Sequence, residues 1–156
     1  TAYELYQCDW SSDVCSSDLL ALFFPVTVFA LESPWGSADY VQARLLSAVD
    51  GVGQEKTLNA ALEIELKEEW HAYWRMPGDG GLAPVFDWAA SENVAGVDVS
   101  WPVPERFSVV GLNSFGYEGR TGFPLVITPK EPGKPVVLDL KAEIMVCKDK
   151  IGRAHV

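Results

Sequence analysis

Apolar and polar residues alternate over long stretches of this chain. The clearest run is residues 58–67, LNAALEIELK, in which every second residue from Leu58 to Leu66 is apolar and the residues between are mostly polar. A period of two places alternate side chains on opposite faces of a strand, as expected where one face packs on a core and the other meets water. The pattern therefore predicts a half-buried β-strand.

Other short apolar runs are bounded by turn-forming residues. Glycine, proline and aspartate cluster at residues 50–53, 76–81 and 131–135, where we expect turns. No segment keeps a helical period over three turns. Regularly spaced strands with Gly/Pro turns between them predict an all-β, antiparallel β-sandwich. The further predicted strands are 41–49, a strand from Trp70 through Ala72 and Trp74 to the turn at 76–81, 85–88, 97–101, 124–128 and 136–147.

The last predicted strand carries a cysteine. Alternation places its apolar residues on one face and Cys147 on the other, together with polar residues such as Lys141 and Glu143. We therefore expect Cys147 to lie on the polar, accessible side of the strand. The residues of the apolar face are Val136, Leu138, Leu140, Ala142, Ile144 and Val146.

Composition narrows the class of protein. The 156 residues are 48% hydrophobic and 12% aromatic, which is enough for one domain with a proper core. The net charge of -10 repels phosphate backbones and argues against nucleic-acid binding. Three cysteines allow at most one internal disulfide, so the chain is not a disulfide-framework miniprotein.

The two ends of the chain are related at the level of DNA. Residues 151–156 can be encoded by ATC GGA AGA GCA CAC GTC, whose reverse complement encodes DVCSSD, the sequence of residues 13–18. The string also resembles a common sequencing adaptor. We therefore predict that residues 1–19 and 150–156 are adaptor sequence read into a metagenomic fragment. Cys147 and His71 are then the cysteine and the histidine that remain.

Residues 20–30, LALFFPVTVFA, form an apolar run too short to span a bilayer. Val28 and Ala30 fit the small-residue positions of a signal-peptidase site, so we interpret the run as a partial signal peptide. The mature domain then covers residues 31–149 and is exported. In an oxidising compartment we expect an accessible thiol to be paired, although an inert cysteine at a strand end is an equal alternative.

Other chemistry has weaker support. Outside the predicted adaptor, His71, Cys147 and the scattered carboxylates show no metal-ligand spacing. No hydrolase signature is present either, so we expect neither a metal nor a cofactor. The Gly-Asp-Gly-Gly run at residues 78–81 lacks the lysine of a phosphate loop and is interpreted as a turn. The aromatic side chains could form a sugar-stacking platform, but Trp74 and Trp88 fit a sandwich core as well.

Several motifs of this chain match a known family. The matching residues are the run WHAYWRMPGD at 70–79, Phe86-Asp87-Trp88, Ser91-Glu92-Asn93, Trp101-Pro102, Phe115-Gly116-Tyr117 and Val146-Cys147. In these residues the chain resembles the N-terminal periplasmic domain of DsbD-type thiol:disulfide interchange proteins, in the branch related to the suppressor-of-copper-sensitivity protein ScsB. The resemblance covers roughly residues 34–149, and its most specific elements are the Tyr-Trp-Arg-x-Pro-Gly-Asp and Phe-Gly-Tyr motifs.

The resemblance implies an immunoglobulin-like sandwich and a protein-disulfide reductase activity in the full-length protein. In this family two cysteines near the end of a late strand cycle between dithiol and disulfide. Cys147 matches the first, and we expect the second to be missing from this fragment, which would then be inactive. The implied partners are a thioredoxin-like domain of the same polypeptide, supplied through a membrane-embedded domain, and periplasmic thioredoxin-fold proteins such as disulfide isomerases. The implied location is the periplasmic side of an inner-membrane protein.

The resemblance also implies residues around the thiol. The family covers its cysteines with an aromatic-bearing loop, which by position would lie near Phe107 to Gly111. Trp70 and Tyr73 match aromatic positions that flank the family's site, although packing in the core is an equal interpretation of both. A different class of function stays open, a non-redox exported immunoglobulin-like module that binds sugar or protein through an exposed row of aromatic residues.

Overall fold

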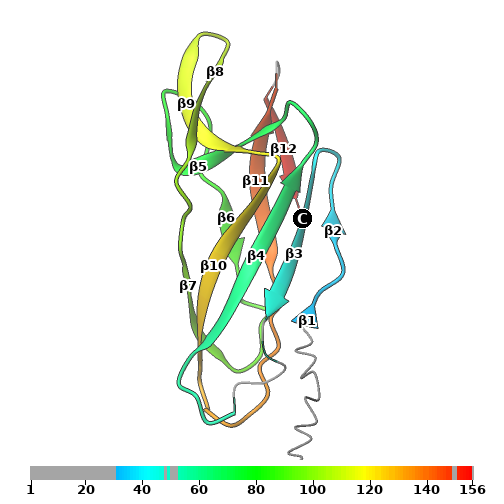
Figure 1. Ribbon diagram of the computed structural model, residues 1–156, viewed down its shortest axis with the longest axis vertical. Coiled ribbons are helices and arrows are strands. Elements are labelled where there is room, and N and C mark those ends of the chain that lie inside the picture. The colour runs from blue at the N-terminus through cyan, green and yellow to red at the C-terminus, as the bar shows by residue number, and fades with distance from the viewer. Residues whose placement is uncertain (1–30, 48, 50–52, 149–150, 156) are drawn as a thin grey trace, which may run out of the picture.

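The computed structural model describes residues 31–47, 49, 53–148 and 151–155 (Figure 1). The segments expected to be adaptor at 1–19 and signal peptide at 20–30 lie outside these residues. The described part of the chain forms twelve strands and no helix. The strands are β1 (Leu31–Glu32), β2 (Gly36–Ser37), β3 (Val41–Ser47), β4 (Leu58–Leu66), β5 (His71–Gly78), β6 (Val85–Asp87), β7 (Val94–Val99), β8 (Glu105–Val109), β9 (Leu112–Glu118), β10 (Arg120–Pro129), β11 (Lys141–Cys147) and β12 (Ile151–His155).

The strands form two sheets that pack face to face. The first sheet has the order β1-β3-β4-β10-β7, with β2 also paired to β3. The second has the order β12-β11-β5-β9-β8, with β6 also paired to β11. Every pairing between the strands is antiparallel. The predicted all-β, immunoglobulin-like antiparallel β-sandwich is confirmed.

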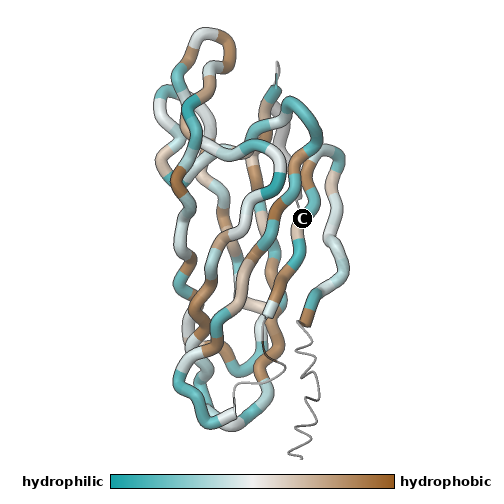
Figure 2. Tube along the Cα trace, viewed as in Figure 1, coloured by the Kyte–Doolittle hydropathy of each residue, from teal (hydrophilic) through white to brown (hydrophobic). Residues whose placement is uncertain are grey.

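Alternation along the strands builds the core between the two sheets, and Figure 2 shows hydrophobic and polar residues interchanging along them. On β4, Leu62 and Ile64 are buried while Glu63 between them is only partly covered. Burying one such aliphatic side chain stabilises the fold by about 1.5–3 kcal/mol. We call this set the inter-sheet core; its buried members are Val41, Ala43, Leu58, Leu62, Ile64, Leu66, Ala72, Tyr117, Phe123, Leu125, Ile127, Ala142, Ile144 and Val146.

The last long strand is shorter than the sequence indicates. β11 begins at Lys141 rather than at Val136, and the preceding segment makes only one isolated bridge, between Val137 and Glu92. The Ser91 hydroxyl makes the hydrogen bonds that a neighbouring strand would otherwise make. It donates to the carbonyl of Asp139 and accepts from the N–H of Asp139. The backbone of this segment is thus satisfied without a ladder. Its apolar side chains still pack against the inter-sheet core.

β8 and β9 are among the strands that were not predicted. They form a hairpin whose turn, Val110-Gly111, has positive φ at both residues. Two-residue hairpin turns of this kind favour Asn-Gly or Asp-Gly, and a β-branched residue at positive φ is uncommon. The sequence therefore lacks the usual signal for this hairpin. The hairpin lies at the end of the sandwich where β11 ends and β12 begins (Figure 1).

The segment expected to be adaptor at residues 150–156 contains a strand. The backbone of β12 pairs with β11 over the register Glu143↔His155 to Cys147↔Ile151. The second sheet therefore continues one strand beyond β11.

Candidate functional site

Cys147 is the last residue of β11, and its side chain is 0% exposed. The expectation that it lies on an accessible face is therefore wrong. The alternation argument itself holds, because Val146 pairs with Ala72 and belongs to the inter-sheet core, whereas Cys147 pairs with His71 on the opposite face. Cys147 is buried because another part of the chain covers that outer face.

The cover comes from the β8–β9 hairpin. Cys147 packs in a second apolar cluster with Tyr73 and Val109, flanked by Phe107 and Met145, and we call these five residues the Cys147 cluster. Phe107 and Val109 belong to β8, so the hairpin curls over the outer face of β5 and β11. A close approach makes this possible: a Cβ at Gly116 would lie 1.9 Å from the carbonyl oxygen of Ala72 and 2.8 Å from the Phe107 ring.

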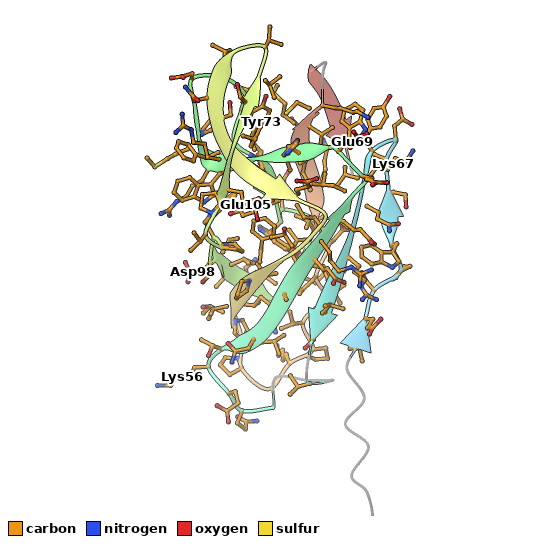
Figure 3. The ribbon with its side chains drawn as sticks, turned by 45° about the horizontal axis from the view of Figure 1, so that its top comes forward. Lys56, Lys67, Glu69, Tyr73, Asp98 and Glu105 are labelled. Carbon is orange, nitrogen blue, oxygen red and sulfur yellow. The ribbon has the colours of Figure 1, made fainter. Side chains whose placement is uncertain are left out.

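Tyr73 contacts the thiol directly. Its side chain is 1% exposed and packs against Cys147 in the same buried cluster, and a hydrogen bond between its hydroxyl and the thiol acts on the pKa of both groups. Burial, and then the hydrogen bond and proximity to the thiol, raise the pKa of Tyr73 well above its usual value, so the hydroxyl keeps its proton. Figure 3 shows Tyr73 at the end of the molecule that carries the β8–β9 hairpin, away from Lys56 near the other end.

Two effects change the pKa of the Cys147 thiol in opposite directions. Burial raises the pKa of Cys147 above its ordinary value, because the apolar surroundings disfavour the thiolate. The hydrogen bond from Tyr73 lowers it, because a donor stabilises negative charge on sulfur. Burial dominates, so the closed site holds a protonated thiol with a donor already in place for the thiolate.

Phe107 lies over this pair as the resemblance implies. Its ring stacks on His71 with centroids 4.5 Å apart and an interplanar angle of 19°. It also meets the Tyr73 ring at a tilt, with centroids 5.6 Å apart. Phe107, Tyr73 and Cys147, three residues singled out from the sequence, are thus brought together.

Trp70 lies elsewhere. Its ring stacks on Tyr40 with centroids 3.8 Å apart, and it packs against the inter-sheet core. It precedes β5 and has the parity of Ala72, whose side chain faces inward. Among the described residues, Trp70 is not a member of the Cys147 cluster. The contacts that Trp70 makes in the structure are packing contacts.

His71 is the neighbour of Cys147 that the sequence argument did not assign to the thiol. It stands opposite Cys147 in the β5–β11 pairing. Its Nε2 is 3.6 Å from a carboxylate oxygen of Glu118, while its buried Nδ1 has no hydrogen-bond partner among the described residues. His71 and Tyr73 are two residues apart on one strand and share a face, and this parity could have placed both beside the thiol.

Outside the Cys147 cluster, we looked at possible metal ligands, possible membrane-spanning helices and cavities. Within the described ranges, no group of three or more His, Cys, Asp and Glu side chains could hold a metal ion. In the same part of the chain, no helix has the length and apolar character needed to cross a membrane. An apolar hollow of about 500 Å³ lies at the opposite end of the sandwich, lined by residues such as Leu31, Leu58 and Val136. Its polar lining residues include Ser33, Ser47 and Lys134.

Two comparisons place the chain among known proteins. A family model described as "Thiol:disulfide interchange protein DsbD, N-terminal" matches residues 40–152. The crystal structure of the N-terminal periplasmic domain of ScsB from Proteus mirabilis superposes with a TM-score of 0.63 at 23% sequence identity. That match covers 82% of this chain and 50% of the ScsB chain, so this chain spans half the length of that structure. No curated protein matches the sequence.

Proposed function

The chain belongs to the family of DsbD N-terminal domains, which are thiol-disulfide exchange domains, and on that premise we propose that Cys147 is its redox-active thiol. The observation that carries the proposal is the Cys147 cluster. In it a buried thiol packs against the side chain of Tyr73 and lies beneath an aromatic residue of a covering hairpin. A structural cysteine would fill space equally well in the inter-sheet core and would need no such cover.

The exchange proceeds in two displacements. The Cys147 thiolate attacks one sulfur of a partner disulfide, the partner S–S bond breaks, and the released partner thiolate takes up a proton. A second thiolate of the domain then attacks Cys147 in the mixed disulfide and releases the reduced partner as a dithiol. Two electrons pass from the domain to the partner, and the domain is left with a disulfide.

Each residue of the cluster has a role in this proposal. Tyr73 stabilises negative charge on sulfur when Cys147 attacks and again when it leaves. Phe107 shields the thiol from small oxidants until a partner displaces the β8–β9 hairpin. Trp70 supports β5 from the core side through its stack on Tyr40.

The second cysteine and the electron supply belong to the proposal as well. We propose that the source gene encodes a further cysteine shortly after Asp149, and that the codons for residues 150–156 derive from an adaptor. In the full-length, membrane-anchored protein, a membrane-embedded domain and a thioredoxin-like domain of the same polypeptide supply reducing equivalents. The domain passes them to thioredoxin-fold proteins of the periplasm. Sequencing the source DNA across the codon for Asp149 tests this, and a continuation without cysteine would overturn it.

Trapping a mixed disulfide tests the assignment of Cys147. A thioredoxin-fold protein with a single active-site cysteine, activated as its thionitrobenzoate disulfide, is mixed with the chain, and the adduct is located by peptide mass spectrometry. We expect an adduct at Cys147 that forms at least about tenfold faster than with activated glutathione, because a folded partner can displace the hairpin. Cys8 and Cys15 of the same chain serve as internal comparisons, and Cys147→Ser is the control. Equal rates with both reagents would overturn the assignment.

The alternative, a binding module with an exposed row of aromatic residues, gains no support from the described tryptophans. Trp70, Trp74, Trp88 and Trp101 are partly buried and pack against the inter-sheet core. Trp35 is also partly buried and lies under the guanidinium of Arg44, 4.6 Å from its ring centroid. Failure of the trapping experiment would return the binding module to consideration.

A further inference from the structure

A glycine-rich segment lies against the tyrosine that contacts the thiol. Residues Gly78 to Gly81, which we call the glycine strap, begin at the last residue of β5 and turn back toward the start of β9. A Cβ at Gly81 would lie 2.3–2.5 Å from three carbon atoms of the Tyr73 ring. Real Cβ contacts are much longer, so the backbone of Gly81 approaches the ring more closely than any other residue type would allow.

The strap is held in place from the other side by β9. The N–H of Asp79 donates to the carbonyl of Asn113 at 2.9 Å, and the N–H of Asn113 donates to a carboxylate oxygen of Asp79 at 3.2 Å. The buried hydroxyl of Ser114 donates to the carbonyl of Gly80 at 3.4 Å. The Tyr73 ring is therefore enclosed between the strap on one side and the other residues of the Cys147 cluster on the other side.

Gly81 also has a backbone conformation that favours glycine. Its φ is +95°, in the region that residues with a Cβ adopt only with strain. The requirement for glycine is thus twofold, since both the conformation and the contact exclude a side chain. Neither requirement comes from the inter-sheet core, because Tyr73 lies on the outer face of its sheet.

We propose that Gly81 is a positioning residue for the thiol: the glycine strap fixes the Tyr73 ring against Cys147, where its hydroxyl can act on the thiol. The strap acts through Tyr73 and touches no reacting atom. The inference deepens the proposed function, because it matters for exchange only if Cys147 is the redox-active thiol. The contact chain Gly81–Tyr73–Cys147 can nevertheless be tested without any exchange partner.

The test is a titration of the thiol in the intact chain. Cysteine labelled with ¹³C at Cβ gives one resonance per cysteine, and Cys147→Ser identifies the resonance of residue 147. In Gly81→Ala the added methyl group displaces the Tyr73 ring, and loss of the donor raises the pKa of Cys147 by about one pH unit. Tyr73→Phe should give a similar rise, and Gly81→Ala should add nothing further in the Tyr73→Phe background.

The strap supplies a matched control. A Cβ at Gly80 would meet only the end of the flexible Leu112 side chain, at 2.9 Å, and the φ of Gly80 is not in the positive region. Gly80→Ala should therefore leave the titration of Cys147 unchanged. Among the described residues, the other titratable groups near the thiol are His71, with Glu118 beside it, and Lys148, which pairs with Glu69. All four stay intact in these variants.

The outcomes separate the two proposals. A Cys147 titration that shifts in Tyr73→Phe but not in Gly81→Ala would overturn the role of the strap and leave the proposed function standing. If Gly81→Ala does not fold, Asp79→Ala removes an anchor of the strap without adding volume, and it should raise the pKa of Cys147 in the same direction by a smaller amount. An unchanged titration in Asp79→Ala, with Tyr73→Phe shifted, would likewise overturn the proposal.

Discussion

The two buried clusters of this sandwich differ in how they are assembled. The inter-sheet core draws alternate residues from strands of both sheets, and it contains no residue with an evident chemical role. The Cys147 cluster lies on the outer face of one sheet, draws only on β5, β8 and β11, and contains the thiol and its hydrogen-bond donor. Burial between sheets follows from the period of a strand, whereas burial on an outer face needs another element to fold over it.

The contrast is sharpest within β11. Val146 and Cys147 are adjacent and both are 0% exposed, yet they point to opposite faces and into different clusters. Val146 stabilises the fold because side chains from both sheets surround it. Cys147 is covered by the β8–β9 hairpin on the outer face of one sheet. The comparison therefore predicts that stability and thiol reactivity can be changed separately.

The largest effect is expected from truncating the inter-sheet core. Ile144 is 0% exposed, so Ile144→Ala should lower the free energy of unfolding by about 3 kcal/mol, because it removes buried methylenes and leaves a cavity. Met145→Ala, one residue away on the Cys147 face, should cost less than half as much, since Met145 is only partly buried. Urea denaturation measures both. Equal losses would show that the two clusters are equally important for stability.

A smaller effect comes from the two buried tyrosines, one in each cluster. Burial raises the pKa of Tyr117 to about 12 and that of Tyr73 further still. An acid whose pKa is raised by folding stabilises the native state up to its unfolded pKa near 10, and this contribution is lost as the pH rises through the folded value. We expect stability to fall by about 2 kcal/mol per tyrosine between pH 10 and 12.

Replacing each tyrosine separates the clusters. Tyr117→Phe and Tyr73→Phe should both reduce this alkaline loss, measured as urea midpoints at pH 10, 11 and 12. Tyr117 donates to the carbonyl of Pro102 at 2.9 Å, in the inter-sheet core, so only Tyr73→Phe should also shift the titration of Cys147. A shift of the Cys147 titration in Tyr117→Phe would contradict the separation of the two clusters.

The same contrast explains what the sequence could predict. The strand at 58–66 and the inward face of β11 follow from side-chain alternation alone, and both are found as expected. The start of β11 was placed too early, because a serine hydroxyl on another segment satisfies the backbone of Asp139 and no pattern within residues 136–140 encodes that contact. Local periodicity predicts which face of a strand is apolar, but not where its pairing begins.

At the candidate site, parity predicted the face of Cys147 and failed to predict its burial. The missing information was the β8–β9 hairpin, whose turn residue Val110 adopts a φ of 53° that its residue type disfavours. The close contact of Gly116 with Ala72 is also set by tertiary structure. The position of Phe107 over the site came from family resemblance, which carries tertiary information that a single sequence pattern lacks.

Opening the outer cluster should affect reactivity more than stability. Phe107 is partly exposed, so Phe107→Ala should cost about 1–2 kcal/mol of unfolding free energy. The rate of iodoacetamide modification at Cys147, followed on the peptide Ala142–Lys148 after trypsin cleavage, should rise about tenfold or more, because the thiol loses its cover. Val103→Ala, at a side chain that is 91% exposed, is the control and should change neither quantity. Unchanged modification in Phe107→Ala would show that Phe107 does not limit access.

The smallest effect is expected just beyond the outer cluster, where Lys148 pairs with Glu69 on the turn before β5. The hydrogen bond from Lys148 lowers the pKa of Glu69, so any stabilisation by the pair is present above the ordinary pKa of glutamate and is lost as the pH falls through the lowered value. The pair is exposed and screened by salt, so Glu69→Gln should leave the urea midpoint at pH 7 unchanged within error. The modification rate of Cys147 should also stay the same, because the hairpin covers the thiol and the ion pair does not. A faster modification in Glu69→Gln, reproduced in Lys148→Gln, would extend the cover of Cys147 to this turn and redraw the boundary of the cluster.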